Sequence, residues 1–153
     1  MWTSFHEGAF GLEDGEEFVG GFAGGFLARQ YIPGYGVYAT TRRIIGVALT
    51  STPARQFLGG ALAGFVQGQL MPKLSRDDSK RVILELDLKK EFALHKDEIS
   101  QIEIKKPGLL STGQMIITSK AGEKTQISLR YRVAFERLRD LMKAFYPEVV
   151  RLV

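Results

Sequence analysis

Two adjacent arginines, Arg42 and Arg43, are the residues of this chain whose types and spacing point most directly to chemistry. They separate VYAT from IIGVAL, two runs rich in β-branched and aromatic residues, so a tight turn is expected at Thr41 and Arg42. A turn can present guanidinium groups to a phosphate, which arginine binds through paired hydrogen bonds. Arg42 and Arg43, with Arg29, are therefore the predicted anion-binding residues. The alternative is that one of the pair forms an ion pair with an acid of the N-terminal segment or of a strand.

Catalysis finds little support in the sequence. The only histidines, His6 and His95, are far apart, and neither stands in a recognised motif with an acid or a hydroxyl residue. Asp77-Asp78 and Lys105-Lys106 are interpreted as solvated loop pairs. The chain has no cysteine and no phosphate-binding loop of the GxxxxGK[ST] type. We therefore predict no enzyme activity, no catalytic residue, no metal site and no cofactor.

The composition is that of one ordinary globular domain. The 153 residues are 44% hydrophobic and 25% charged, and the first of them lack the pattern of a secretory signal. A single cytoplasmic domain over residues 1–153 is the expectation. Residues 1–30 carry a net charge of −4 and residues 31–80 carry +4. A mixed, solvated surface is the simplest interpretation, although such asymmetry also fits a basic face that meets anionic lipid.

The first half of the chain predicts strands broken by turns. Residues 17–29 are glycine-rich and fit either a strand or a short helix, and IPGYG at 32–36 predicts a turn after them. Residues 37–40 and 44–49 predict two short strands joined as a hairpin. A single long strand would place Arg43 on the same face as Val37, Ala39 and Ile45.

The second half predicts a meander of short strands and one helix. Residues 73–80 read as a loop, and the alternation in residues 82–88 predicts a strand with all its leucines on one face. Further strands are expected around Phe92 and Leu94, at 99–104, and on both sides of a turn at Gly122. Near the C-terminus the period changes to that of an amphipathic helix. Its apolar stripe consists of Ala134, Phe135, Leu138, Leu141, Met142 and Phe145.

Residues 57–71, FLGGALAGFVQGQLM, form an uncharged stretch within a predicted insertion at 50–80. The stretch is shorter than the roughly 20 residues that span a bilayer as a helix. Helical spacing would align small residues four apart, a pattern that lets another helix approach closely. The alternative is an apolar segment that lies on a membrane surface. The predicted interface residues are Leu58, Gly60, Leu62, Gly64, Phe65 and Gly68.

Several phrases of the sequence resemble bacterial and archaeal pleckstrin-homology-like (PH-like) and GRAM-like families. They are EDGEE at 13–17, VYATTRRII at 37–45, HKDEISQIEI at 95–104, GQMIITSKAGEKTQISL at 113–129, and the C-terminal helix. The resemblance covers residues 35–146, more weakly 11–30, and the chain departs from it between Leu49 and Val82. It implies an α+β fold: an antiparallel β-barrel or sandwich of about seven short strands, capped by a C-terminal helix, here with a glycine-rich insertion.

The resemblance also implies a non-catalytic binding or scaffolding module. The expected partner is a second copy of the chain or another protein, met through the glycine-rich stretch and with an anionic membrane surface as a further candidate. The alternative is a domain that binds anionic lipid headgroups through Arg29, Arg42 and Arg43. Because these families carry a basic residue at the hairpin regardless of ligand, the ion-pair alternative for one of the two arginines is favoured. Nucleic acid is not an expected partner, and nucleic-acid binding is kept only as a minor alternative: the aromatic residues nearest the arginines, Tyr31, Tyr35 and Tyr38, are interpreted as core and turn residues.

Overall fold

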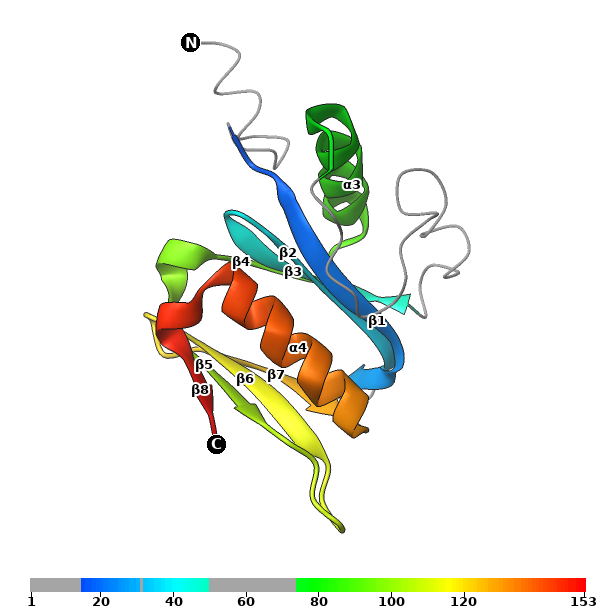
Figure 1. The fold of residues 1–153 in the computed structure, drawn as a ribbon, viewed down its shortest axis with the longest axis vertical. Coiled ribbons are helices and arrows are strands. Elements are labelled where there is room, and N and C mark those ends of the chain that lie inside the picture. Colours follow the sequence, from blue (N-terminus) through cyan, green and yellow to red (C-terminus); the bar gives the residue numbers. More distant parts are fainter. Residues whose placement is uncertain (1–14, 31, 50–73) are drawn as a thin grey trace.

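A computed structural model describes residues 15–30, 32–49 and 74–153 of the chain. These residues form an α+β fold, as predicted (Figure 1). In chain order the elements are β1 (Phe18–Arg29), β2 (Ile32–Thr40), β3 (Arg43–Ala48), α3 (Arg76–Lys89), β4 (Phe92–His95), the 3₁₀ turn η3 (Lys96–Glu98), β5 (Ile99–Lys105), β6 (Gly113–Ser119), β7 (Lys124–Leu129), α4 (Arg132–Phe145), the 3₁₀ turn η4 (Pro147–Val149) and β8 (Val150–Leu152).

The strands form one mixed sheet of eight strands in the order β4-β3-β2-β1-β7-β6-β5-β8. Strands β1 to β4 form one antiparallel meander and β5 to β7 a second. The two meanders are joined by a short pairing of β1 with β7, at Leu27↔Leu129 and Ala28↔Ser128. The short strand β8, which the sequence did not predict, pairs with β5 in parallel. The sheet is not closed in the described residues, and the expected antiparallel barrel or sandwich of about seven strands is observed there as one mixed sheet of eight.

Helix α4 lies between the two meanders and covers the main core (Figure 1). All six residues of its predicted apolar stripe are buried. They pack against alternate side chains of the strands, such as Val37 and Ala39 of β2 and Ile102 and Ile104 of β5. The predicted C-terminal helix is therefore confirmed, together with the face that it buries.

Residues 76–89 form helix α3, where the sequence analysis expected the end of a loop and a strand. The alternation of leucines in this segment is compatible with a strand, but the local signals for a helix are stronger. The Ser75 side chain caps the first turn by accepting a hydrogen bond from the N–H of Asp78 at 3.1 Å. Leucine, glutamate, lysine and arginine, which dominate the segment, are good helix formers. The buried residues Val82, Ile83 and Leu86 lie on one face of the helix.

A second apolar cluster lies under α3, on the opposite face of β1 to β3 from α4. It joins Val82 and Leu86 of α3 to Phe18, Tyr38 and Ile45. Strand β3 is consequently buried on both faces, which explains its nearly continuous apolar sequence.

The IPGYG segment is the start of β2 and not the predicted turn. The chain reverses one step earlier, so that Arg29 pairs with Ile32. Gly34 has φ +79°, which glycine adopts readily, and it lies opposite a register shift between Gly24 and Ala28. The turn-like composition of this segment thus accommodates a register shift in the pairing of β1 with β2. Residues 57–71, with all the predicted interface residues, lie outside the described part of the chain.

The glycines of GGFAGGF are not equivalent in β1, and this difference can be tested. A Cβ on Gly21 would overlap the ring of Tyr38, which is fully buried, whereas a Cβ on Gly25 would meet no atom within 4 Å. We expect Gly21→Ala to lower the free energy of unfolding by about 1–3 kcal/mol, the cost typical of overpacking a core. Gly25→Ala is the matched control and should change it by less than about 0.5 kcal/mol, as surface substitutions do. Urea unfolding of both variants checks this, and equal losses would contradict it.

Candidate anion-binding site

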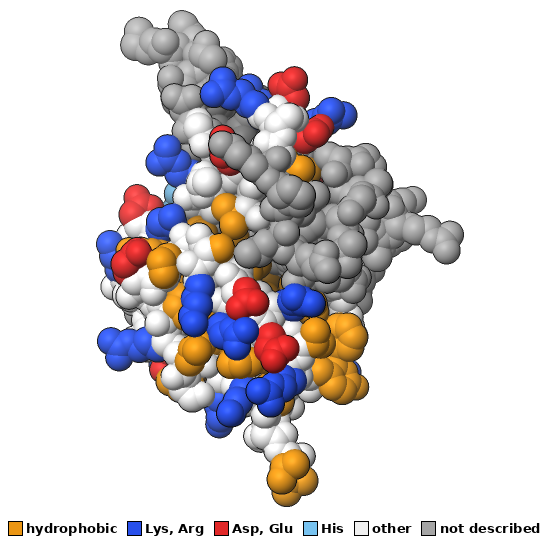
Figure 2. All heavy atoms as spheres, in the orientation of Figure 1, with side chains coloured by type: hydrophobic (Ala, Val, Ile, Leu, Met, Phe, Trp, Pro, Cys, Tyr) orange, Lys and Arg blue, Asp and Glu red, His pale blue; other side chains and the backbone are white. Residues whose placement is uncertain are grey.

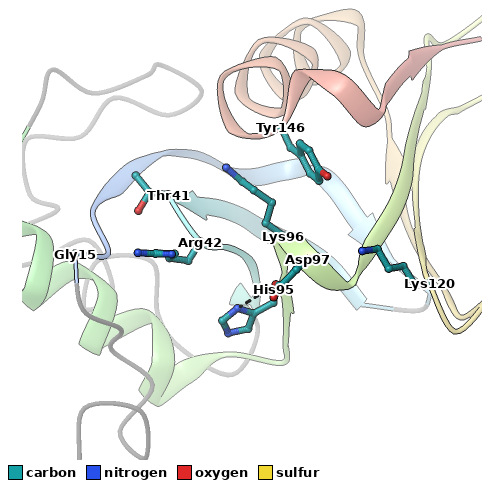
Figure 3. A pocket seen from close by; sticks show the side chains of 8 residues that line it. All are labelled: Gly15, Thr41, Arg42, His95, Lys96, Asp97, Lys120 and Tyr146. Carbon is teal, nitrogen blue, oxygen red and sulfur yellow. Dashed lines mark ion pairs between the residues drawn. The ribbon is translucent and has the colours of Figure 1, made fainter. Parts of the chain in front are cut away.

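A pocket of about 630 Å³ lies at the end of the sheet where the β2–β3 turn, the β4–β5 connection, the β6–β7 turn and the end of α4 meet (Figure 3). Backbone hydrogen bonds join these segments, because η3 bonds to the β2–β3 turn on one side and to the β6–β7 turn on the other. We name it the basic pocket. It is lined by Gly15, Thr41, Arg42, His95, Lys96, Asp97, Lys120 and Tyr146.

Arg42 is exposed on a β2–β3 turn that is fixed by hydrogen bonds. The hydroxyl of Thr40 accepts hydrogen bonds from the N–H groups of Arg42 and Arg43, both at 3.0 Å. The same hydroxyl donates to Glu16 at 2.6 Å. Glu17 forms two further hydrogen bonds to the turn: its N–H donates to the Thr41 hydroxyl, and its carbonyl accepts from the Thr41 N–H. The turn that carries Arg42 is therefore anchored to the segment before β1.

Lys96 is the second cation of the pocket. Its N–H donates to the carbonyl of Arg42 at 2.8 Å, which ties η3 to the β2–β3 turn. Its ammonium lies 5.0 Å from the ring centroid of Phe145 and 5.6 Å from that of Tyr146, at the C-terminal end of α4. Cation–π contact and the negative end of the helix dipole both favour a positive charge at this place.

Lys120 is the third cation and comes from the β6–β7 turn. The N–H of Lys120 donates to the carbonyl of Glu98 at 2.8 Å, so this turn is also attached to η3. Gly122 has φ +89° in the turn, as the sequence predicted. Asp97 is the only carboxylate among the lining residues, so the arginine, the two lysines and this carboxylate sum to a charge of +2.

Three cations from three separate segments suit one ligand chemistry best. Phosphate oxygens accept hydrogen bonds from the guanidinium fork of arginine and attract the ammonium groups of lysine as point charges. In the described ranges no group of three His, Cys, Asp or Glu residues is placed to hold a metal ion. The pocket can bind an anion, and it also holds His95, whose Nδ1 lies 3.9 Å from Oδ1 of the exposed Asp97 (Figure 3).

Arg43 lies apart from the pocket in a buried ion-pair network. It is on the face of β3 that also carries Ile45 and points toward α3. Its guanidinium donates to Glu16 Oε2 at 2.8 Å and bidentately to Asp87, at 2.8 and 2.7 Å. Burial opposes ionisation of Arg43, but the hydrogen bonds to Asp87 and Glu16 raise its pKa above the ordinary value. This is the ion pair with an N-terminal acid that the sequence analysis favoured for one of the two arginines.

Arg29, the third predicted residue, lies elsewhere. It forms an ion pair with Glu91, and its guanidinium lies 5.1 Å from the ring centroid of Phe92. It lines a smaller pocket of about 330 Å³ with Lys124. Of the three predicted residues only Arg42 lines the basic pocket, so the structure does not bring the three together.

Lys96 and Lys120 are the residues that the sequence analysis missed. Each stands in a polar turn and reads as an ordinary solvated lysine. The sequence carries no signal that relates them to Arg42, because the connections that hold the three residues belong to two separate meanders and to the link between these meanders.

Comparison with known proteins adds no relative: no protein-family model matches the chain, and no curated protein is significantly similar to it. Across the described residues no helix is long and apolar enough to span a membrane. The longest, α3 and α4, have 14 residues each.

Proposed function

We propose that the protein is a non-catalytic binding module with a PH-like fold, whose basic pocket takes a phosphate-bearing group. The order of strands supports the PH-like assignment: two antiparallel meanders meet at β1 and β7, and a C-terminal helix packs between them. Fold analogy cannot name a ligand, so the proposal depends on the site. The observation that carries it is that Arg42, Lys96 and Lys120, from three separate segments, line one pocket.

The size of the pocket fits a small polyanion. About 630 Å³ lies within the range of roughly 300–1,000 Å³ that is usual for small-molecule sites. A phosphorylated sugar or inositol ring would fill such a space and engage the cations from more than one side. The same chemistry occurs in soluble phosphate esters and in phosphorylated lipid headgroups. Self-association or protein binding through residues 57–71 stays a separate proposal, for which light scattering on a deletion variant is the test.

The test is a titration with inositol 1,4,5-trisphosphate, followed by amide chemical shifts. We expect the largest changes at Thr41, Lys96 and Lys120. Lys120→Gln should weaken binding by about tenfold or more, because a hydrogen bond to a charged group contributes about 1.5–3 kcal/mol. Lys106→Gln is the matched control, since it removes one exposed lysine charge from the β5–β6 loop. It should leave the affinity within about twofold, because a charge separated from the ligand by more than a Debye length is largely screened.

Equal weakening by the two variants would contradict the proposal, because it would indicate a general effect of charge. The source of the phosphate is found by measuring the wild type and Lys120→Gln with vesicles that contain phosphatidylinositol bisphosphate. If Lys120→Gln weakens vesicle binding as strongly as it weakens trisphosphate binding, the ligand is a lipid headgroup. If only trisphosphate binding is weakened, the ligand is a soluble phosphate compound.

A further inference from the structure

The connection between β5 and β6 carries the most exposed apolar side chains of the described residues. Leu109 and Leu110 are fully exposed, at 104% and 103% of their reference areas. They follow the end of β5 at the far end of the molecule from α3, where Figure 1 shows the connection extending beyond the sheet and Figure 2 shows an apolar tip. We name residues 106–112 the leucine tip. Two adjacent leucines that bury nothing in the folded chain require an explanation.

The leucine tip has a defined local structure. The N–H of Gly108 donates to the carbonyl of Ser111 at 3.0 Å, so Leu109 and Leu110 occupy the two positions that this bond encloses. At the base, a Cβ on Gly113 would lie only 2.5 Å from the carbonyl oxygen of Lys105, which shows how closely the two strands of the hairpin approach. The leucines are thus presented by a closed turn.

The charges around the tip are all positive. Lys105 and Lys106 precede it and are exposed. The pairing of Gly113 with Leu129 brings the segment after β7, with Arg130 and Arg132, to the same end of the sheet. Residues 105–112 and 130–135 contain these four cations and no acid. Beyond these ranges the nearest carboxylates in the chain are Glu103 of β5 and Glu136, which forms a partly exposed ion pair with Arg132.

Aromatic side chains stand at the base of the tip, at the level of the cations. Phe26 and Tyr131 are 38% and 57% exposed and pack edge to face, with ring centroids 5.3 Å apart. The N–H of Arg130 donates to the carbonyl of Phe26 at 2.9 Å, which fixes the end of β7 beside β1. Aromatic residues with a polar edge, like tyrosine, are favoured at the boundary between lipid and water.

We propose that this end of the protein docks on an anionic lipid bilayer, with Leu109 and Leu110 inserted below the headgroups. The order of groups along the axis of the tip matches the order of layers in the bilayer: leucines lead, and cations and aromatic rings follow at headgroup depth. A bilayer is the occupant that the charges favour, because it offers a continuous apolar layer under a negative surface. The inference is independent of the phosphate pocket, which lies at the other end of β6.

The first test is sedimentation with vesicles of phosphatidylcholine alone and with 30% phosphatidylserine. The chain should bind the anionic vesicles, and added salt should weaken the binding. Leu109→Ser with Leu110→Ser should weaken it by about a hundredfold, since burying each leucine contributes about tenfold or more. Lys105→Gln with Lys106→Gln should weaken it by about tenfold to thirtyfold, at roughly fivefold for each charge near the surface. The control is Leu88→Ser, at a leucine of α3 that is 84% exposed, and it should change nothing.

The second test uses the absence of cysteine from the chain. Leu109→Cys and Lys120→Cys are labelled in turn with an environment-sensitive fluorophore. Anionic vesicles should shift the emission to the blue at position 109 and leave position 120 unchanged. A shift at 120 alone would overturn the inference while leaving phosphate binding in the pocket intact. Unchanged vesicle binding in the double serine variant would overturn the inference as well. A change in the oligomeric mass of this variant, measured in solution by light scattering, would also overturn it, because it would assign the tip to a protein partner.

Discussion

Replacing Arg43 with alanine is expected to lower the free energy of unfolding by about 3–5 kcal/mol, the range for breaking a buried ion pair from one side. The side chains of Arg43, Glu16 and Asp87 are 3%, 0% and 8% exposed. Removing the cation leaves two carboxylates inside the protein with their strongest hydrogen-bond donors gone. The cost is the desolvation of these acids, which water cannot relieve without opening the contact between α3 and the sheet.

Urea unfolding of the Arg43→Ala variant measures the effect. Arg81→Ala is the control, because Arg81 forms an ion pair with Asp78 on the same helix but its side chain is 69% exposed. An exposed pair of this kind contributes less than about 1 kcal/mol. Similar losses in the two variants would show that the buried network adds no more than a surface pair.

The pH dependence of stability provides a second readout of the same network. Burial opposes ionisation of Asp87, yet the hydrogen bonds from Arg43 and Lys90 hold its pKa below the ordinary value. A carboxyl with a lowered pKa in the folded state stabilises the protein above its unfolded pKa of about 4, and this stability is lost as the pH falls through the folded value. The wild type should therefore lose more stability between pH 6 and pH 3 than the Arg43→Ala variant does.

The parts of the fold that the sequence predicted are those whose signals are local. The stripe of α4 repeats at the helical period, and Gly122 marks the turn between β6 and β7. Both were found with their buried residues or backbone angle in place. In each case the residues that determine the local structure lie within the segment itself, so the prediction did not require contacts with residues distant in the sequence.

The parts that it did not predict depend on partners distant in the sequence. Strand β8 has three residues and exists because β5 offers a free edge beside it. The open sheet likewise results from where the two meanders meet. For α3, the leucine alternation suited both a strand and a helix, and the Ser75 cap was the local signal that should have decided.

Arg43 illustrates how far the sequence could specify a site residue. The sequence favoured an ion pair for one of the two arginines but did not indicate that Arg43 would form it. In the structure Arg43 opens β3 and is buried, because Asp87 on α3 and Glu16 before β1 converge on it from separate segments. No spacing in the sequence relates these three residues. For the same reason, the sequence did not indicate that Lys96 and Lys120 would line one pocket with Arg42.

The basic pocket and the leucine tip lie at opposite ends of the β5–β6–β7 meander. Strand β6 has seven residues, which corresponds to about 23 Å at the usual rise per residue. A flat bilayer that receives the leucines is then beyond the reach of Lys120. The two proposals together define a module with one end on a membrane and the other turned to a phosphate-bearing ligand in solution. The pocket therefore cannot bind a headgroup of the same membrane into which the tip is inserted.

Leu138→Ala is expected to lower the free energy of unfolding by about 2–5 kcal/mol, the range for truncating a buried leucine. Leu138 is fully buried and lies in the middle of the α4 stripe, where the two meanders face each other across the helix. Because the sheet is open, α4 is what keeps water from the apolar faces of both meanders. A cavity at this point is enclosed by both meanders, and collapse around it would require them to move together.

Leu88→Ala is the matched control and also tests the helix at residues 76–89. It is the same change in a second helix, and both residues belong to apolar patterns in the sequence. A strand through residues 82–88 would place Leu88 on the buried face with Val82, Leu84 and Leu86. In α3 it is 84% exposed, so the variant should unfold within about 0.5 kcal/mol of the wild type. A loss of stability for Leu88→Ala as large as that for Leu138→Ala would contradict this expectation. It would indicate a strand at residues 82–88 in place of the helix that positions Asp87 beside Arg43.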